Sequence, residues 1–254
     1  MYNQSRELGF PLMAGSSVPL AWRIPEIELE IGAPVKKVVM TSYGGKEAYG
    51  FHALEALQCM VERREGGESG VASVQCLEGQ YVWDWTDSHP WAETLLDKAI
   101  AQCPEAKEGS PRDTVKRPIL FLIDYRDGLQ AAVYTLNGHL SSWAMAAQIQ
   151  GQPNPVALLF NLQNERPYGH FSSLVHYIEE LIITGKETYP VERTLLTTGI
   201  LSALMNSSYY DGRKIDEGRK IGTDLLDISY NPPAESFFNR GPMPTASKDF
   251  GIGP

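Results

Sequence analysis

The stretch 44-GGKEAYGFHALE-55 is a glycine-rich turn that runs directly into an amphipathic helix. Apolar residues recur at helical spacing from Phe51 to Val61, and they predict a helix over 47–64. The turn places His52 in the first turns of that helix, where its ring can face a pocket. An imidazole with a pKa of about 6.5 accepts or donates a proton at neutral pH. His52 is therefore the first candidate functional residue.

Other segments around this helix alternate between strand and helix patterns. Strands are expected at 35–43, 71–77, 119–125, 129–136, 142–149 and 156–162, and further helices at 91–101, 171–183 and 191–207. The last four strands follow one another, with an Asp127-Gly128 hairpin signal after the first, which predicts an antiparallel meander. The expected fold class is α+β, a mostly antiparallel open sheet with helices packed on one face.

The first residues have a different character from the rest of the chain. Residues 2–8 suit the end of a helix capped by Gly9, and 10–14 is an apolar run typical of a buried strand in a parallel sheet. We expect 1–17 to be a remnant of a doubly wound parallel domain whose other strands lie upstream of Met1 or on another chain. Residues 18–34 are then a linker, and 35–227 form the α+β domain. Residues 228–254 are a tail rich in Pro and Gly, disordered alone or wrapped as an arm over a neighbouring subunit.

The amino-acid composition excludes some kinds of binding partner. The formal charge is -9 and no long cluster of Lys or Arg is present, which argues against nucleic acid and anionic membrane surfaces. The polar start predicts no secretory signal, and no segment reaches the roughly 20 apolar residues of a membrane span. Three cysteines without CxxC spacing indicate reduced thiols, no zinc site and a cytoplasmic protein. A small-molecule substrate is the expected partner.

The order strand, glycine-rich loop, histidine-bearing helix, strand, antiparallel strands and closing helices resembles a known family. The likeness rests on Gly44-Gly45, on 50–55, on the strand-and-hairpin segment 121–136, and on 11-PLMAGSS-17. These match the C-terminal domain and the last dinucleotide-domain strand of the glucose-fructose oxidoreductase and inositol dehydrogenase (Gfo/Idh/MocA) family. The resemblance covers the chain up to about residue 215.

This resemblance implies a nicotinamide-dependent oxidation or reduction of a sugar- or polyol-like substrate. NAD or NADP is expected in the complete protein, and none is expected to bind this chain alone, which has no GxGxxG loop after a strand. His52 matches the family's histidine that contacts substrate and exchanges the proton. The family commonly has an aspartate four residues earlier, where this chain has Ala48.

Candidate residues around His52 each have a structural alternative. Lys46 and Tyr49 are expected to bind substrate from the rim of the pocket, or else to be solvated loop residues. Glu55 and Cys59 follow His52 at i+3 and i+7, so a metal site is conceivable there. A carboxylate that orients the imidazole and a packed thiol explain the same pattern, and no metal is expected.

Further candidates lie outside the helix. Ser16 and Ser17 follow the expected first strand, where cofactors bind in open α/β sheets. Trp22 and Arg23 are expected to contribute to substrate binding, the alternative being a linker with Trp22 in a domain interface. His170 precedes a helix in a polar cluster that could bind an anion or simply cap the helix.

Two other functions remain open from the sequence. A non-enzymatic binding or oligomerisation module would use the same sheet, and we expect a homo-oligomer formed through its open face. Ala48 favours this alternative. A cofactor-independent isomerase or lyase acting through His52 and a nearby carboxylate is the third possibility.

Overall fold

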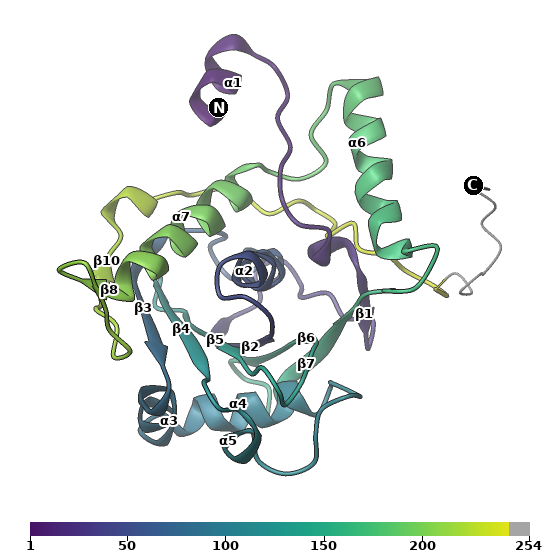
Figure 1. Ribbon diagram of the computed structural model, residues 1–254. Coiled ribbons are helices and arrows are strands. Elements are labelled where there is room, and N and C mark those ends of the chain that lie inside the picture. The colour runs from purple at the N-terminus through teal and green to yellow at the C-terminus, as the bar shows by residue number, and fades with distance from the viewer. Residues whose placement is uncertain (244–254) are drawn as a thin grey trace, which may run out of the picture.

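An eight-stranded sheet forms the centre of the computed structural model, which describes residues 1–243 (Figure 1). The strand order is β1-β7-β6-β2-β5-β4-β3-β10, and only β2 and β5 pair in parallel. The strands are β1 (Trp22–Ile24), β2 (Val35–Ser42), β3 (Val71–Glu78), β4 (Ile119–Tyr125), β5 (Gln130–Thr135), β6 (Trp143–Ile149), β7 (Val156–Asn161) and β10 (Ile221–Gly222). A separate hairpin joins β8 (Tyr209–Tyr210) and β9 (Arg213–Lys214).

The central strand β2 interrupts the predicted meander. It lies between β5 and β6, so that β4–β5 and β6–β7 are antiparallel pairs on its two sides. Val38 and Met40 enter one apolar cluster, and Val39 enters another on the opposite face. A strand that is apolar on both faces is stabilised by neighbours on both edges and helices on both faces. The expectation of an uninterrupted meander was therefore wrong.

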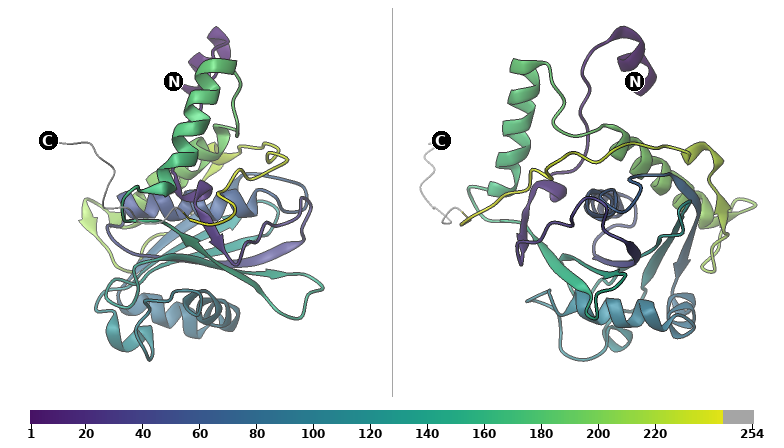
Figure 2. Two further views of the ribbon diagram at one scale, coloured as in Figure 1. Left: turned by 90° about the vertical axis from the view of Figure 1, so that its right-hand side faces the viewer. Right: turned by 180° about the vertical axis from the view of Figure 1, so that it is seen from behind.

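Helices cover both faces of the sheet (Figure 2). α2 (Ala48–Val61) and α7 (Glu192–Ser207) pack on one face, and α3 (Gln80–Asp87), α4 (Pro90–Ile100) and α5 (Pro111–Thr114) lie on the other. The α+β class with a mostly antiparallel open sheet is confirmed, and the difference is that helices occupy two faces instead of one. The face expected to form a homo-oligomer is partly covered by α4, whose Leu95 and Leu96 are buried there. The homo-oligomer stays a prediction.

The structure of the N-terminal segment agrees only in part with the structure expected from the sequence. α1 (Tyr2–Leu8) ends at Gly9, which has a left-handed φ of 70°, as predicted. No strand forms at 10–14, because no neighbouring strand pairs with it, and Phe10 is 40% exposed. The expectation of a buried strand there was wrong for this structure. Within 18–34, a 3-10 turn (Val18–Leu20) precedes β1, which pairs with β7 at the sheet edge.

The tail wraps over its own chain. Phe238 is buried, the backbone N–H of Asn239 donates to the carbonyl of Leu20, and Trp22 donates to the carbonyl of Gly241. In this structure 228–243 therefore pack against their own chain, while disorder or wrapping over a neighbour stays a prediction, and 244–254 lie outside the described residues. α6 (Ser172–Thr184) projects from the same side of the molecule as α1 and buries none of its residues (Figure 1). The remaining elements are 3-10 turns at Gly169–Phe171 and Asp224–Leu226.

Candidate functional site

His52 lies on α2, partly buried, with its ring fixed from the N-terminal segment. The Oγ atom of Ser16 is 2.7 Å from Nδ1 of His52, and the backbone N–H of Val18 donates to the same Oγ at 3.1 Å. A hydroxyl has two acceptor lone pairs, so Ser16 can accept from both Val18 and a protonated Nδ1. In that tautomer Nε2 of His52 holds a lone pair, and no residue of 1–243 is bonded to it.

Aromatic side chains surround this imidazole. Its ring centroid lies 6.3 Å from that of Tyr49 and 5.9 Å from that of Trp143, and the Tyr49 and Trp143 rings are stacked at 5.7 Å. Tyr43 contacts both of these rings. The indole N–H of Trp143 is buried and has no partner among the described residues. The result is a histidine set among flat apolar faces, with one unused hydrogen-bond donor beside it.

Tyr43 and Trp143 also lie at this site, although the sequence alone did not indicate them. Tyr43 directly follows β2, and Trp143 opens β6, the antiparallel neighbour of β2. The signal was aromatic residues at strand ends beside a glycine-rich turn. Gly44 makes that turn possible, because its φ is +75° and a Cβ there would lie 2.4 Å from the Tyr49 ring.

Burial lowers the pKa of His52 below its ordinary value of 6.5. The ring is then neutral at pH 7. Because the folded chain binds fewer protons here than the unfolded chain, this group's contribution to stability is present above pH 6.5 and is lost as pH falls below it. Burial also lowers the pKa of His139 and of His170, which adds to the same pH dependence.

We expect the imidazole of His52 to titrate below pH 6.5 and to carry its proton on Nδ1 near pH 7. NMR of the ¹⁵N-labelled ring across pH measures both properties. Ser16→Ala removes the acceptor for Nδ1–H and should increase the share of the Nε2–H tautomer. A ring that titrates above 6.5 in the wild-type chain would contradict this electrostatic description.

Glu55 and Cys59 both have hydrogen-bond partners within the protein. Glu55 is buried and accepts from the backbone N–H of Ser16 at 3.3 Å and from Oγ1 of Thr197 at 2.5 Å. The thiol of Cys59 donates to the carbonyl of Ala56, and burial raises its pKa to about 11. Within residues 1–243, no group of three His, Cys, Asp or Glu residues could hold a metal ion.

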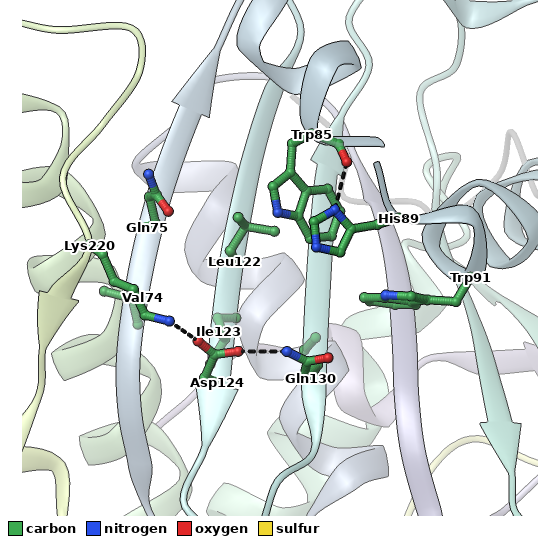
Figure 3. A pocket seen from close by; sticks show the side chains of 11 residues that line it. Val74, Gln75, Trp85, His89, Trp91, Leu122, Ile123, Asp124, Gln130 and Lys220 are labelled. Carbon is green, nitrogen blue, oxygen red and sulfur yellow. Dashed lines mark hydrogen bonds and ion pairs between the residues drawn. The ribbon is translucent and has the colours of Figure 1, made fainter. Parts of the chain in front are cut away.

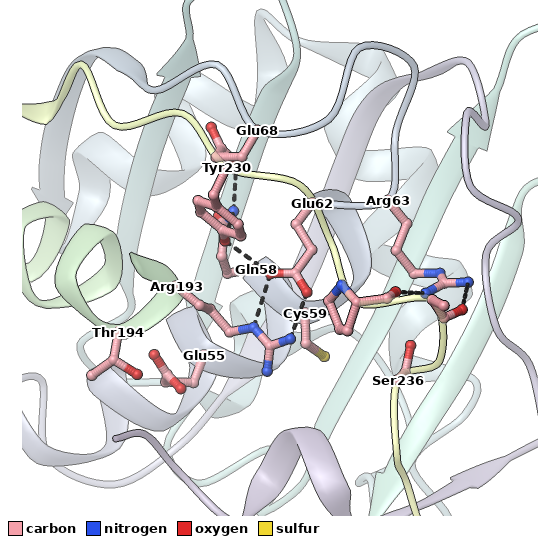
Figure 4. Close-up of polar contacts among 12 residues, drawn as sticks. Glu55, Gln58, Cys59, Glu62, Arg63, Glu68, Arg193, Thr194, Tyr230 and Ser236 are labelled. Carbon is pink, nitrogen blue, oxygen red and sulfur yellow. Dashed lines mark hydrogen bonds and ion pairs between the residues drawn. The ribbon is translucent and has the colours of Figure 1, made fainter. Parts of the chain in front are cut away.

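A buried ion pair ties α2 to α7. Arg193 donates to both carboxylate oxygens of Glu62, at 2.9 and 2.5 Å, and Tyr230 adds a hydrogen bond to Glu62 at 2.8 Å (Figure 4). Burial alone would lower the pKa of Arg193, but the charge of Glu62 and its hydrogen bonds raise it well above its ordinary value. This network fixes the helix that carries His52.

The other predicted site residues have partners of their own. Lys46 donates to Glu78 at 2.9 Å and to Ser208 at 3.0 Å. Arg23 is buried, donates to the carbonyl of Ile27 and lies over the Phe238 ring at 4.1 Å. Their expected roles in substrate binding stay predictions.

Three more predicted residues are also engaged away from the imidazole. Trp22 is held by Gly241 through its indole N–H, and His170 is held by the carbonyl of Gln163 at 2.6 Å. Ser17 is buried and precedes the turn at Val18–Leu20. Of the predicted site residues, the structure brings together His52, Tyr49 and Ser16.

No family model and no curated protein matches the chain. No helix of residues 1–243 has both the length and the apolar character that crossing a bilayer requires.

Solved structures of similar arrangement do exist. A probable dehydrogenase from Thermotoga maritima has 9% identity, covers 77% of this chain and 58% of its own, and gives a TM-score of 0.41. An NAD-binding protein from Listeria innocua has 11% identity, covers 68% of this chain and 52% of its own, and gives a TM-score of 0.33. An aldose-aldose oxidoreductase from Caulobacter crescentus has 17% identity, covers 72% of this chain and 55% of its own, and gives a TM-score of 0.32. The chain therefore spans a little more than half the length of these structures. At these identities and TM-scores, what the chain does has to rest on its own residues.

Proposed function

We propose that this chain is the substrate-binding half of a nicotinamide-dependent oxidoreductase that acts on a sugar- or polyol-like substrate. The observation that carries the proposal is the state of His52. Ser16 holds its Nδ1, while Nε2 is unpaired among the described residues and lies in an aromatic surround. NAD or NADP would be held by a dinucleotide-binding half, since this chain contains no such loop.

The chemistry of alcohol oxidation assigns His52 a defined step. As a hydride leaves the carbon for the nicotinamide, the hydroxyl must lose its proton, and an imidazole with a free Nε2 lone pair can accept it. The lowered pKa keeps the ring neutral and therefore able to act as a base at pH 7. In the reverse direction the imidazolium returns the proton to the new alcohol. Ser16 positions the ring and does not itself react.

The surrounding residues suit a hydroxylated substrate. Tyr49 is 38% exposed, so its ring can pack against the C–H groups of a sugar or polyol and its hydroxyl can be reached from solvent. Trp143 is only 4% exposed and its indole N–H is buried, so it supports the Tyr49 ring from behind by stacking at 5.7 Å. We assign Tyr49 to substrate binding on these grounds.

The experiment that tests the proposal begins with the genomic reading frame around Met1. An in-frame upstream segment with alternating strands and helices would supply the missing half, and the longer protein should form NADH or NADPH when given a sugar or polyol. A longer protein that turns over none of a broad panel of these substrates with either cofactor would reject the proposal.

A further inference from the structure

A cavity lies on the opposite side of the sheet from His52. Its volume is about 140 Å³, and it lies between β3–β5 and the corner formed by α3 and α4 (Figure 3). Leu122 of β4 is part of the apolar cluster on this face, whereas α2 packs in the cluster on the other face. The cavity is therefore separate from the site proposed for the oxidoreductase.

Two oppositely charged side chains that line this cavity, Asp124 and Lys220, pair with each other. Asp124 accepts from Lys220 at 2.7 Å, from Ser73 at 2.9 Å and from Gln130 at 3.2 Å. Although burial alone would raise the pKa of Asp124, these hydrogen bonds and the charge of Lys220 lower it, so the carboxylate is ionised at neutral pH. A charged ligand placed beside this ion pair would have no free counter-charge from it.

Unused hydrogen-bonding groups line the other walls. Nδ1 of His89 donates to the carbonyl of Trp85 at 2.7 Å, which leaves Nε2 as an acceptor. Nε2 of Gln75 donates to backbone carbonyls, and its Oε1 is unpaired among the described residues. The indole N–H groups of Trp85 and Trp91 likewise have no partner in residues 1–243, and the two rings meet at 89° with centroids 5.9 Å apart. The His89 ring stacks on one face of Trp85 with centroids 3.9 Å apart. The cavity therefore offers both donors and acceptors beside aromatic side chains.

We propose that this cavity binds a small neutral polyol, or one edge of a sugar ring. An apolar ligand would displace water from the amide, imidazole and indole groups without replacing its hydrogen bonds, which is costly. A polyol supplies donors and acceptors to them and lays its C–H groups against the tryptophan walls. A cavity of about 150 Å³ holds a molecule the size of benzene, so a ligand of roughly six to eight non-hydrogen atoms fits.

Erythritol is the probe that tests this site. We expect it to shift the indole N–H signals of Trp85 and Trp91 in ¹H–¹⁵N spectra, with a dissociation constant in the millimolar range. Asp124→Asn should weaken binding about tenfold, because loss of the charge releases Lys220, Ser73 and Gln130, the donors that the carboxylate holds in place at this wall of the cavity. Asp216→Asn is the matched control: it also neutralises an aspartate paired with a cation, Arg117 at 2.9 Å, but it lies outside the cavity lining. It should leave binding unchanged.

Two further variants separate loss of erythritol binding from unfolding and from the function of His52. Gln75→Ala removes an unpaired acceptor and should weaken erythritol binding even if Asp124→Asn unfolds, as judged by thermal melting. His52→Gln should leave binding here unchanged, so failure of the oxidoreductase proposal is distinguishable from failure of this one. The inference is overturned if erythritol leaves both indole signals unmoved at concentrations that saturate a millimolar site. It is also overturned if acetate shifts them at lower concentration than erythritol does.

Discussion

Replacing Arg193 by methionine is expected to lower the free energy of unfolding by about 3–5 kcal/mol. The guanidinium and its partner carboxylate, Glu62, are almost fully buried, with 3% and 1% of their side chains exposed. Removing the cation leaves Glu62 charged in an apolar surround with Tyr230 as its remaining side-chain donor. Urea unfolding followed by circular dichroism measures the loss.

Arg6→Met provides the control for this stability prediction. Arg6 pairs with Glu187 and Glu192 at the surface, where its side chain is 41% exposed, so its removal should cost less than about 1 kcal/mol. Adding Glu62→Gln to Arg193→Met should recover part of the lost stability, because the buried charge is then gone. Equal losses for Arg6→Met and Arg193→Met would show that the buried pair does not anchor α2.

The second large effect is on turnover. In a protein completed by its dinucleotide-binding half, His52→Gln should lower kcat by roughly 10²–10⁴-fold, the usual contribution of a general base. Glutamine is close in size and polar but takes no proton at neutral pH. Steady-state rates of NADH or NADPH formation measure the change, and an unchanged unfolding curve shows that the fold is kept.

Ser16→Ala separates positioning from proton transfer. Loss of the Nδ1 partner should reduce kcat by less than His52→Gln does and alter its pH profile, because the tautomer and pKa of His52 change while the base remains. If His52→Gln retained wild-type kcat at every pH, His52 would have no part in proton transfer.

Most elements of the sheet and the long helices could be predicted from apolar spacing. The turn at Gly44, the helix of His52, the C-cap at Gly9 and the hairpin at Asp127-Gly128 each depend on residues that are close together in the sequence. The position of β2 between β5 and β6 is not local, and it depends on which strands bury Val38 and Val39 from both faces. α3 has eight residues, a glycine before it and no side-chain cap, so its sequence gives little helical signal.

Some residues of the candidate site could also be predicted from local sequence, whereas others depend on contacts between distant parts of the chain. His52 and Tyr49 could be identified because both belong to the glycine-rich turn and its helix. The contact of His52 with Ser16 joins residues 36 positions apart, and Trp143 reaches the site through strand pairing. Arg23 and His170 have side chains whose chemistry suits substrate binding, but in the folded chain both donate to backbone carbonyls. Which polar residue faces a ligand depends on tertiary packing that residue type does not specify.

Ring-resolved ¹⁵N NMR during a titration with sugars and polyols such as myo-inositol measures whether Nε2 of His52 faces the substrate as a free base. We expect the Nε2 signal of His52 to shift on addition of the ligand while Nδ1 stays protonated. The Tyr49 and Trp143 signals should move over the same concentration range. A panel of sugars and polyols that leaves the His52 ring unmoved, or a wild-type ring with its proton on Nε2, would contradict this role of His52.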